Sequence, residues 1–442
     1  PCQDICPTRA LFRRRDGIVD LNAEWCIGCK SCMAACPYDQ LFIDPNTNTA
    51  EKCNFCANRL ESGLEPACVV VCPTQCRVFG DLVDPSSKFS KLIHRESVSV
   101  RRPEYNTRPN IYYIEGSRQL LDPTHSAQSG IYKQGEMDAQ RKEMTPPWES
   151  QRGGGRAVYD TFHKTPWGEK IEIYLMTKGV STGLLVLSLL LWWFGFESSL
   201  FSLWMPLLSG LLLAATGALL ITDLKQPGRF HYILLRPNWR SWMAWGTWFI
   251  AADGALTALW VLAALAGVEG LLELLLWPAV AAGGLASIYT GFFFAQASAR
   301  DLWKGSENTL DIAIQTGLKG AAALLFFATL LPIAQRDESL AVLGTVLFVL
   351  VLLHACVLAF SALAHRSGST AHDRAIDLLV HGPFRGDSWG GAVALGCALP
   401  LLLIGWRGLG GWGAVLAGLF AVAGAYFWDR VWVRAGQAVP LS

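Results

Sequence analysis

The sequence predicts an α+β head joined to an all-α bundle of eight transmembrane helices. Two observations lead to this prediction. Eleven of the thirteen cysteines lie between Cys2 and Cys76, in a stretch that is polar and rich in turn residues. Long apolar runs begin after about residue 173, and they raise the hydrophobic content to 52% against 17% charged residues. That proportion is high for a soluble protein.

The head is predicted from one cysteine motif, Cys26-x2-Cys29-x2-Cys32-x3-Cys36 followed by Pro37. This spacing binds an iron–sulfur cubane, and the fourth cysteine crosses to a neighbouring cluster. A zinc ribbon would show two separated Cys-x2-Cys pairs, and a disulfide framework does not need three cysteines at such short steps. We therefore expect a head of tandem ferredoxin-like units that hold [4Fe–4S] clusters.

The other cysteines of the head repeat this pattern, because Cys6-Pro-Thr and Cys72-Pro-Thr each close a cysteine group. Cys76 falls outside the pattern and is expected to be a small buried residue rather than a ligand. Ligand crossing then distributes the ten ligand candidates over four clusters. Cys6, Cys26, Cys29 and Cys32 form one complete quartet, Cys2 and Cys36 belong to its partner, Cys53, Cys56 and Cys68 hold another, and Cys72 reaches a fourth.

Four cubanes need about sixteen thiolates, so we expect about six more cysteines upstream. The sequence opens at Pro1 inside a Cys-x3-Cys-Pro element, which agrees with a longer native chain. Between the cysteine groups, residues 17–20 and 40–44 are bounded by turn residues and predict short strands of ferredoxin hairpins.

The order of the cysteine groups, the insertion between Cys56 and Cys68 and the ending Cys72-Pro-Thr resemble a known family. This is the four-cluster electron-transfer subunit of molybdopterin oxidoreductases of the dimethyl-sulfoxide and polysulfide reductase type. The resemblance covers residues 1–116 and implies a subunit that passes electrons between a molybdopterin catalytic subunit and a membrane anchor.

Residues 117–173 form a predicted arm with little periodicity and too few apolar residues for a core. A flexible linker is one interpretation. An arm lying along a partner subunit is favoured, because a structureless loop of this length is unusual in a compact protein. Trp148 and Trp167 suit anchoring at an interface or at the membrane surface.

The third predicted region, residues 174–442, contains eight apolar windows that are each long enough to span a membrane. An even number of spans puts both ends of the region on one side. The windows are 174–196, 203–222, 242–267, 274–298, 312–334, 340–363, 390–406 and 411–432.

Basic residues in the loops predict the orientation. Nine lie on the side of the head and two on the other, which predicts a cytoplasmic head on the inner (cytoplasmic) membrane. The alternative is that these residues dock an acidic surface of the head. The nine are Lys225, Arg229, Arg236, Arg240, Arg300, Lys304, Arg366, Arg374 and Arg385, and the two are Arg336 and Arg407.

From about residue 170 to the end, the chain resembles the NrfD-like membrane anchor of polysulfide reductase. The resemblance rests on Asp223-Leu-Lys-Gln-Pro227, on residues 235–242, on Tyr289-Thr-Gly291 and on the ending 433–442. Head and anchor are commonly separate chains in that family, so this chain resembles their fusion. The resemblance implies a quinone site within the bundle.

Ionisable residues inside the apolar windows indicate where quinone chemistry occurs, because such residues are costly in a bilayer and usually functional. Asp253 lies twelve residues after Ser241, Tyr289 eleven before Arg300, and His354 twelve before Arg366. At about 1.5 Å per residue they share a depth of about 17 Å. Lys319, slightly shallower, is expected to neutralise Asp253. An acid, a phenol and an imidazole at one depth suit reversible proton transfer to a quinone.

Structural alternatives stay open at this point. Tyr289 can be a packing residue, His354 can make an interhelical hydrogen bond, and Asp253 can pair with Lys319 for assembly. Asp223, His231 and Asn238 form a second candidate position near the head-side surface. We expect the quinone head group between that surface and Tyr289. We expect no haem, because His354 is the single histidine deep in a window.

Together these observations predict an electron-transfer and membrane-anchor subunit that connects the quinone pool to a separate molybdopterin catalytic subunit. Its own part in catalysis, quinone-reactive or none, stays open, and so does the substrate, a sulfur compound or an acyl thioester. A cytoplasmic head favours sulfite oxidation or the organic substrates. The alternatives are a proton-translocating module, with a relay of Asp253, Lys319 and His354, and a structural anchor without quinone. The net charge of +1 gives no sign of a nucleic-acid partner.

Overall fold

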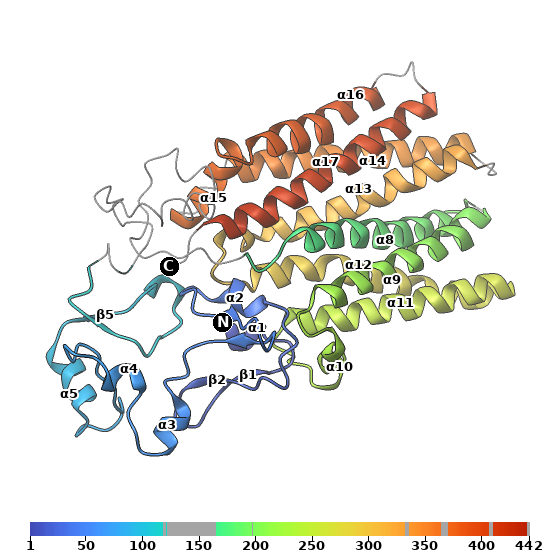
Figure 1. Cartoon of the computed structure of the whole chain (residues 1–442). Helices are drawn as coiled ribbons and strands as arrows, with labels where there is room; N and C mark the ends of the chain where they lie inside the picture. Colours follow the sequence, from blue (N-terminus) through green and yellow to red (C-terminus); the bar gives the residue numbers. More distant parts are fainter. Residues whose placement is uncertain are drawn as a thin grey trace.

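The computed structural model describes residues 1–117, 121, 165–196, 198–331, 336–363, 370–405 and 410–439. The small head lies against one end of a bundle of long helices (Figure 1). The N-terminus and the end of α17 (Gly410–Ala438) lie at that same end, as an even number of spans requires.

The head consists of short elements around loops that carry cysteines. Three antiparallel strand pairs form, and they include the two predicted hairpin strands, now placed at β2 and β3. The pairs are β1 (Leu11–Arg13) with β2 (Val19–Leu21), β3 (Phe42–Ile43) with β4 (Ala50–Glu51), and β5 (Val98–Ser99) with β6 (Tyr113–Ile114). The helices are α1 (Cys2–Ile5), α2 (Ser31–Ala35), α3 (Ala57–Glu61), α4 (Ala67–Val70) and α5 (Lys88–Arg95).

The described residues contain eight helices that are long and apolar enough to cross a membrane, which confirms each predicted window. Two short helices, α10 (Tyr232–Leu235) and α15 (Thr370–Val380), lie at the head end of the bundle. The long helices are α8 (Glu169–Trp193), α9 (Met205–Asp223), α11 (Trp242–Ala266), α12 (Glu269–Ala295), α13 (Ser306–Leu330), α14 (Arg336–Leu363) and α17. The remaining one joins the π-helical segment Gly386–Ala398 to α16 (Leu399–Gly405).

Several helices extend further towards the head than the apolar windows predict. Helix α8 begins at Glu169 rather than at residue 174, and α17 continues to Ala438 rather than ending at 432. Charged side chains in these extra turns have partners. Glu172 is fully buried, and its Oε1 accepts a hydrogen bond from Nε of Arg434 at 2.7 Å. Hydropathy alone therefore underestimates helix length at this end.

Helices α8 and α13 form the centre of the bundle. Their apolar windows are 61% and 67% buried, against 28% for α9, α11 and α14. The two central helices approach most closely at Gly183 and Gly320, where a Cβ on either residue would collide with the other helix. Small residues at such crossings allow close packing where no hydrophobic effect drives helix association.

Candidate cluster site and buried polar residues of the bundle

Four cysteines line one hollow in the head. They are Cys6, Cys26, Cys29 and Cys32, the four residues that ligand crossing predicts as a complete quartet. Three of them are buried and Cys29 is partly buried. Apolar side chains from β1 and β2 complete the lining. The structure thus brings the predicted quartet together from two separate loops.

The chemistry of these thiols fits an iron–sulfur cluster. Burial raises the pKa of Cys26 and of Cys32, and it raises the pKa of Cys29 to about 12. Without a bound cation these thiols would stay protonated at neutral pH, whereas iron holds them as thiolates. The backbone N–H of Ala50 also donates to Sγ of Cys26 at 3.4 Å.

The spacing of the thiols separates a cluster from a single ion. Among the described residues, no three His, Cys, Asp or Glu side chains stand close enough to bind one metal ion. Thiolates of a cubane bind different iron atoms and therefore lie further apart than the ligands of one ion. The quartet fits a [4Fe–4S] cluster, in which iron would exchange single electrons.

The remaining head cysteines are less enclosed. Cys2 and Cys36 interact electrostatically with each other, as expected of ligands to one partner cluster. The expectation that Cys76 is buried is wrong. Cys76 is exposed, and its Sγ lies 3.5 Å from Sγ of Cys72.

The bundle holds the loop of the quartet by its carbonyl oxygens. Gly28, in this loop, has a φ of +67°, and a Cβ there would collide with Lys225 of the bundle. Glycine therefore permits the close approach. Backbone N–H groups of Lys225 and Gln226 donate to the carbonyl oxygens of Gly28 and Ile27 at 3.2 and 3.1 Å, and Nη1 of Arg229 donates to those of Ala23 and Cys26 at 2.7 and 3.2 Å.

Two of the residues predicted near the head-side surface also contact the head. Asp223 forms an ion pair with Lys30 at 2.8 Å. Nδ2 of Asn238 donates to the carbonyl oxygen of Cys6 at 2.8 Å. The His231 ring lies 4.5 Å from the ring of Tyr232. The structure does not join these three residues into one site, and their role in quinone binding stays a prediction.

Some of the basic residues that predict the orientation also dock the head. Besides Arg229, the guanidinium of Arg236 lies over the ring of Trp25, 4.3 Å from its centroid. Arg240 lies 3.6 Å from Asp4. The excess of positive charge on this side therefore serves head binding in part, as the alternative interpretation expects.

Trp167 fills the space between the quartet and the bundle. It is 3% exposed, and its Nε1 donates to the carbonyl oxygen of Cys29 at 3.4 Å. Its ring packs against Phe293 and Phe294 of α12, with centroids 5.3 and 5.2 Å away. Trp167 thus anchors an interface as the sequence predicts. Most of the predicted arm, Trp148 included, lies outside the described residues.

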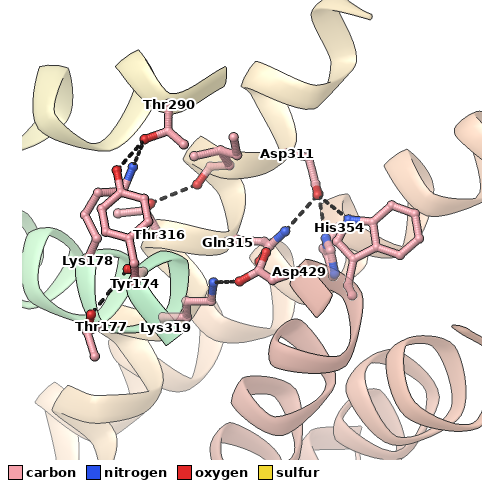
Figure 2. Close-up of polar contacts among 12 residues, drawn as sticks. Tyr174, Thr177, Lys178, Thr290, Asp311, Gln315, Thr316, Lys319, His354 and Asp429 are labelled. Carbon is pink, nitrogen blue, oxygen red and sulfur yellow. Dashed lines mark hydrogen bonds and ion pairs between the residues drawn. The ribbon is translucent and has the colours of Figure 1, made fainter. Parts of the chain in front are cut away.

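Two tyrosines and a lysine meet in the interior of the bundle, and Figure 2 shows two of them, Tyr174 and Lys178, beside Thr290. The hydroxyl groups of Tyr174 and Tyr289 are 2.5 Å apart. Nζ of Lys178 donates to the carbonyl oxygen of Ser287 at 2.8 Å and to Oγ1 of Thr290. The amine also lies over both tyrosine rings. Among the described residues no carboxylate forms an ion pair with Lys178.

Sequence reasoning found Tyr289 and missed Tyr174 and Lys178. Lys178 lies inside an apolar window and is 1% exposed, so the rule that selected Asp253 should also have selected Lys178. Tyr174 gave no comparable signal, because a tyrosine at the edge of a window is typical of the membrane interface.

The expected pairing of Lys319 with Asp253 is wrong. Nζ of Lys319 lies 2.7 Å from Oδ2 of Asp429, which is a residue of α17 that the sequence analysis overlooked (Figure 2). Both side chains are buried. Equal depth along two helices does not fix the direction in which each side chain points, so depth alone chose the wrong partner.

His354 forms the interhelical hydrogen bond that was its structural alternative. Its Nδ1 lies 2.6 Å from Oδ1 of Asp311 on α13. Oδ2 of Asp311 accepts from Nε2 of Gln315 at 2.8 Å and from Nε1 of Trp428 at 2.9 Å. Figure 2 shows this carboxylate at the meeting point of three helices.

Asp253 stands apart from both sets. It is completely buried on α11, and neither carboxylate oxygen has a hydrogen-bond partner among the described residues. Oγ1 of Thr257, one turn further, has none either. A Cβ added at Gly283 of α12 would lie 3.5 Å from Oδ1 of Asp253. Asp253, Tyr289 and His354 thus share no hydrogen-bond partner among the described residues, and their place in one quinone site stays a prediction.

The fold and the quartet define a multi-pass membrane protein with an iron–sulfur head. Residues 1–82 match the model of the 4Fe-4S dicluster domain, and residues 157–440 match that of polysulphide reductase, NrfD. The protein belongs to the NrfD family, as the resemblance predicts, and it carries the iron–sulfur domain in the same polypeptide.

Several relatives match about a quarter to a third of this chain. A tetrathionate reductase subunit of Salmonella typhimurium is 46% identical over 116 residues, 26% of this chain and 46% of the relative. A polysulfide reductase chain of Wolinella succinogenes is 43% identical over 119 residues, 27% of this chain and 62% of the relative. A putative dimethyl sulfoxide reductase iron-sulfur subunit of Halobacterium salinarum is 35% identical over 184 residues, 35% of this chain and 70% of the relative. The chain spans about half the length of the first of these relatives.

Proposed function

We propose that this protein passes electrons between the membrane quinone pool and a separate catalytic subunit, through [4Fe–4S] clusters in the head. One observation carries the proposal. The loop of the quartet is bonded directly to the end of the bundle, and Trp167 connects it to the apolar layer that contains Tyr174 and Tyr289. A cluster and a quinone site in these positions would be separated only by packed aromatic side chains.

The quinone end of the path lies at Tyr289 in this proposal. Quinone reduction takes up two electrons and two protons, so the site needs groups that donate protons and stabilise negative charge. The hydroxyl groups of Tyr174 and Tyr289 are the proton donors in this proposal. The amine of Lys178 stabilises the negative charge. Asp253 and His354 are proton-exchanging candidates further inside. His231, Asp223, Asn238 and Lys319 stay candidates for contacts with the head group or tail.

The complete protein holds four clusters in this proposal, and Cys6, Cys26, Cys29 and Cys32 bind the one that faces the bundle. Cys2 and Cys36 bind its neighbour. The more exposed group of Cys53, Cys56, Cys68 and Cys72 contributes to the two that lead away from the membrane.

The partner is a molybdopterin catalytic subunit. The names of the relatives support this proposal, because a tetrathionate reductase subunit, a polysulfide reductase chain and an arsenate respiratory reductase iron-sulfur subunit are parts of reductases. A sulfur compound or an acyl thioester is the proposed substrate of that subunit. The excess of basic residues on the head side supports a cytoplasmic head on the inner membrane, and protease accessibility of the head in sealed vesicles tests it.

The test of electron transfer uses the purified protein with its native partners. Menadiol, a short-chain quinol, is added under anaerobic conditions, and cluster reduction is followed by absorbance and electron paramagnetic resonance. We expect reduction in the wild type and a rate lower by about 10²-fold in Tyr289→Phe, because the proton-exchanging hydroxyl is lost. Tyr113→Phe, in β6 of the head, is the matched control. Clusters that stay oxidised with quinol but are reduced by dithionite would refute the proposal and favour a structural anchor.

A further inference from the structure

Polar side chains lie at successive positions from Tyr289 into the centre of the bundle. The carbonyl oxygen of Ser287 accepts from Lys178, and Oγ of Ser287 lies 2.6 Å from Oγ1 of Thr316 on α13. Lys319 follows Thr316 by three residues. Its side chain lies against Gly179, the neighbour of Lys178, so closely that a Cβ at Gly179 would collide with it. The two lysines therefore occupy adjoining positions on the two central helices.

The second lysine leads on to two carboxylates and an imidazole. Asp429, the ion-pair partner of Lys319, also interacts electrostatically with Asp311 and His354. Lys178 in turn interacts with Lys319 and Asp429. Figure 2 shows Lys178, Lys319, Asp429, Asp311 and His354, which belong to α8, α13, α17 and α14. Ionisable groups in a bilayer interior carry a high cost and usually a function.

The hydrogen-bonded pair of His354 and Asp311 has a free position for a proton. The indole of Trp428 and the amide of Gln315 both donate to Oδ2 of Asp311. We assign Nδ1 of His354 as the donor to Oδ1 of Asp311, which leaves a lone pair on Nε2. Nε2 of His354 and Oε1 of Gln315 are buried without a partner among the described residues.

The path is closed on the side away from the head. Beyond Lys178, Lys319 and Asp429, the helices α8, α13 and α17 continue to their far ends without a further Lys, Arg, His, Asp or Glu. Apolar residues such as Leu325, Leu347 and Ala421 fill that half of the bundle. On α14, the next ionisable residues beyond His354 are in its first turn, at Arg336, Asp337 and Glu338.

We infer that Lys178, Lys319, Asp429, Asp311 and His354 form a dead-ended proton store that exchanges protons with the quinone site at Tyr289. The inference rests on the proposed function and deepens it. Oxidation of one quinol releases two electrons, which leave through the head, and two protons. One proton passes along the lysines and carboxylates to Nε2 of His354, and the resulting imidazolium is stabilised by Asp311. The other proton is released to water on the head side. Reduction of a quinone takes up the stored proton and a second one from that water.

The elements packed against α14 are α13, α17, the π-helical segment Gly386–Ala398 and α16. Asp311 of α13 contacts this imidazole, and Asp429 of α17 interacts with it electrostatically. Lys319 is paired with Asp429, Cys397 of the π-helical segment interacts with Asp311, and α16 carries no titratable group. The carboxylates favour the imidazolium and Lys319 opposes it. Because the charges of Lys319 and Asp429 cancel each other, Asp311 determines whether the imidazolium of His354 is stabilised. A store without an exit on the far side differs from a proton-translocating module, which needs a path to both surfaces.

The experiment records infrared difference spectra of the full complex, with clusters oxidised and then reduced by menadiol. We expect an imidazolium band in the wild type, its absence in His354→Gln, and its absence in Lys319→Met, which keeps the histidine but cuts the path. Thr329→Val should keep the band, because Thr329 is buried on the same α13 and its hydroxyl donates to Leu325 of its own helix. Reduced clusters without a histidine band in the wild type, or a band that persists in His354→Gln, would overturn the store.

Two further outcomes are distinguishable. If menadiol leaves the wild-type clusters oxidised, the proposed function fails and the store fails with it. In sealed vesicles with the head outside and a pH dye in the lumen, we expect no lumenal pH change during turnover. A lumenal change that an uncoupler abolishes would contradict the dead end and indicate translocation instead.

Discussion

The indole N–H of Trp167 points to the carbonyl oxygen of Cys29, at 3.4 Å, across the joint between the head and the bundle. The same tryptophan is bonded through its backbone N–H to Oε1 of Gln437, at 2.9 Å, near the end of α17. One residue thus contacts a ligand loop of the quartet, the aromatic residues of α12 and the last helix of the protein.

Replacing this tryptophan should weaken the joint. We expect Trp167→Ala to lower the stability by about 3 kcal/mol, because a large buried ring is removed. Thermal unfolding in detergent measures the loss, and menadiol-driven cluster reduction should slow as the packing is disturbed. Trp167→Phe keeps an aromatic ring but loses the N–H. Its melting temperature should lie between those of the wild type and Trp167→Ala. Equal melting temperatures for wild type and Trp167→Ala would show that the contact is not needed.

Removal of one thiolate of the quartet should cost a whole cluster. Cys32→Ala leaves three buried thiols around the hollow, and we expect the iron and acid-labile sulfide content to fall by one cluster per protein molecule. Cys76→Ala is the control, because Cys76 is exposed and outside the predicted ligand sets. Chemical analysis of iron and sulfide measures the cluster content of both variants. An equal iron loss in the two variants would make Cys76 a ligand.

The crossing of α8 and α13 should not tolerate a methyl group. Gly320→Ala forces a Cβ into the backbone of Gly183, and overpacking of this kind costs about 1–3 kcal/mol. Gly217→Ala on α9 is the matched control, because a Cβ there meets nothing within 4 Å. Thermal unfolding of both variants in the same detergent measures this difference in stability. A stable Gly320→Ala protein would mean that the two helices can move apart without loss.

Asn238 should contribute more to head docking than a nearby ion pair. Its amide donates to Cys6 and to two other carbonyl oxygens of the N-terminal turn, so Asn238→Ala should cost about 2 kcal/mol. Arg240→Ala removes the exposed pair with Asp4 and should change stability by less than about 1 kcal/mol. The rate at which a protease cleaves the head compares head docking in the two variants. Faster cleavage in Arg240→Ala than in Asn238→Ala would reverse this ranking.

The sequence was informative wherever spacing along the chain determines structure. The Cys26–Cys36 motif predicted the quartet, and apolar windows predicted all eight long helices, because cluster geometry and bilayer thickness both fix residue spacing. Contacts between helices were different. Depth in the bilayer placed Lys319 beside Asp253, whereas the rotation of α13 turns it towards Asp429. Lys178 was overlooked although the rule for buried charge applied to it equally.

The docking of the quartet loop uses main-chain oxygens at residues 23 to 28, and main-chain oxygens are present whatever side chains a sequence carries. The bundle therefore recognises the path of a loop more than its composition. A foreign ferredoxin module with the same loop conformation and a glycine at the position of Gly28 would present the same acceptors. This makes the head an exchangeable part, and chimeras could couple one quinone-reactive anchor to electron carriers of different potential.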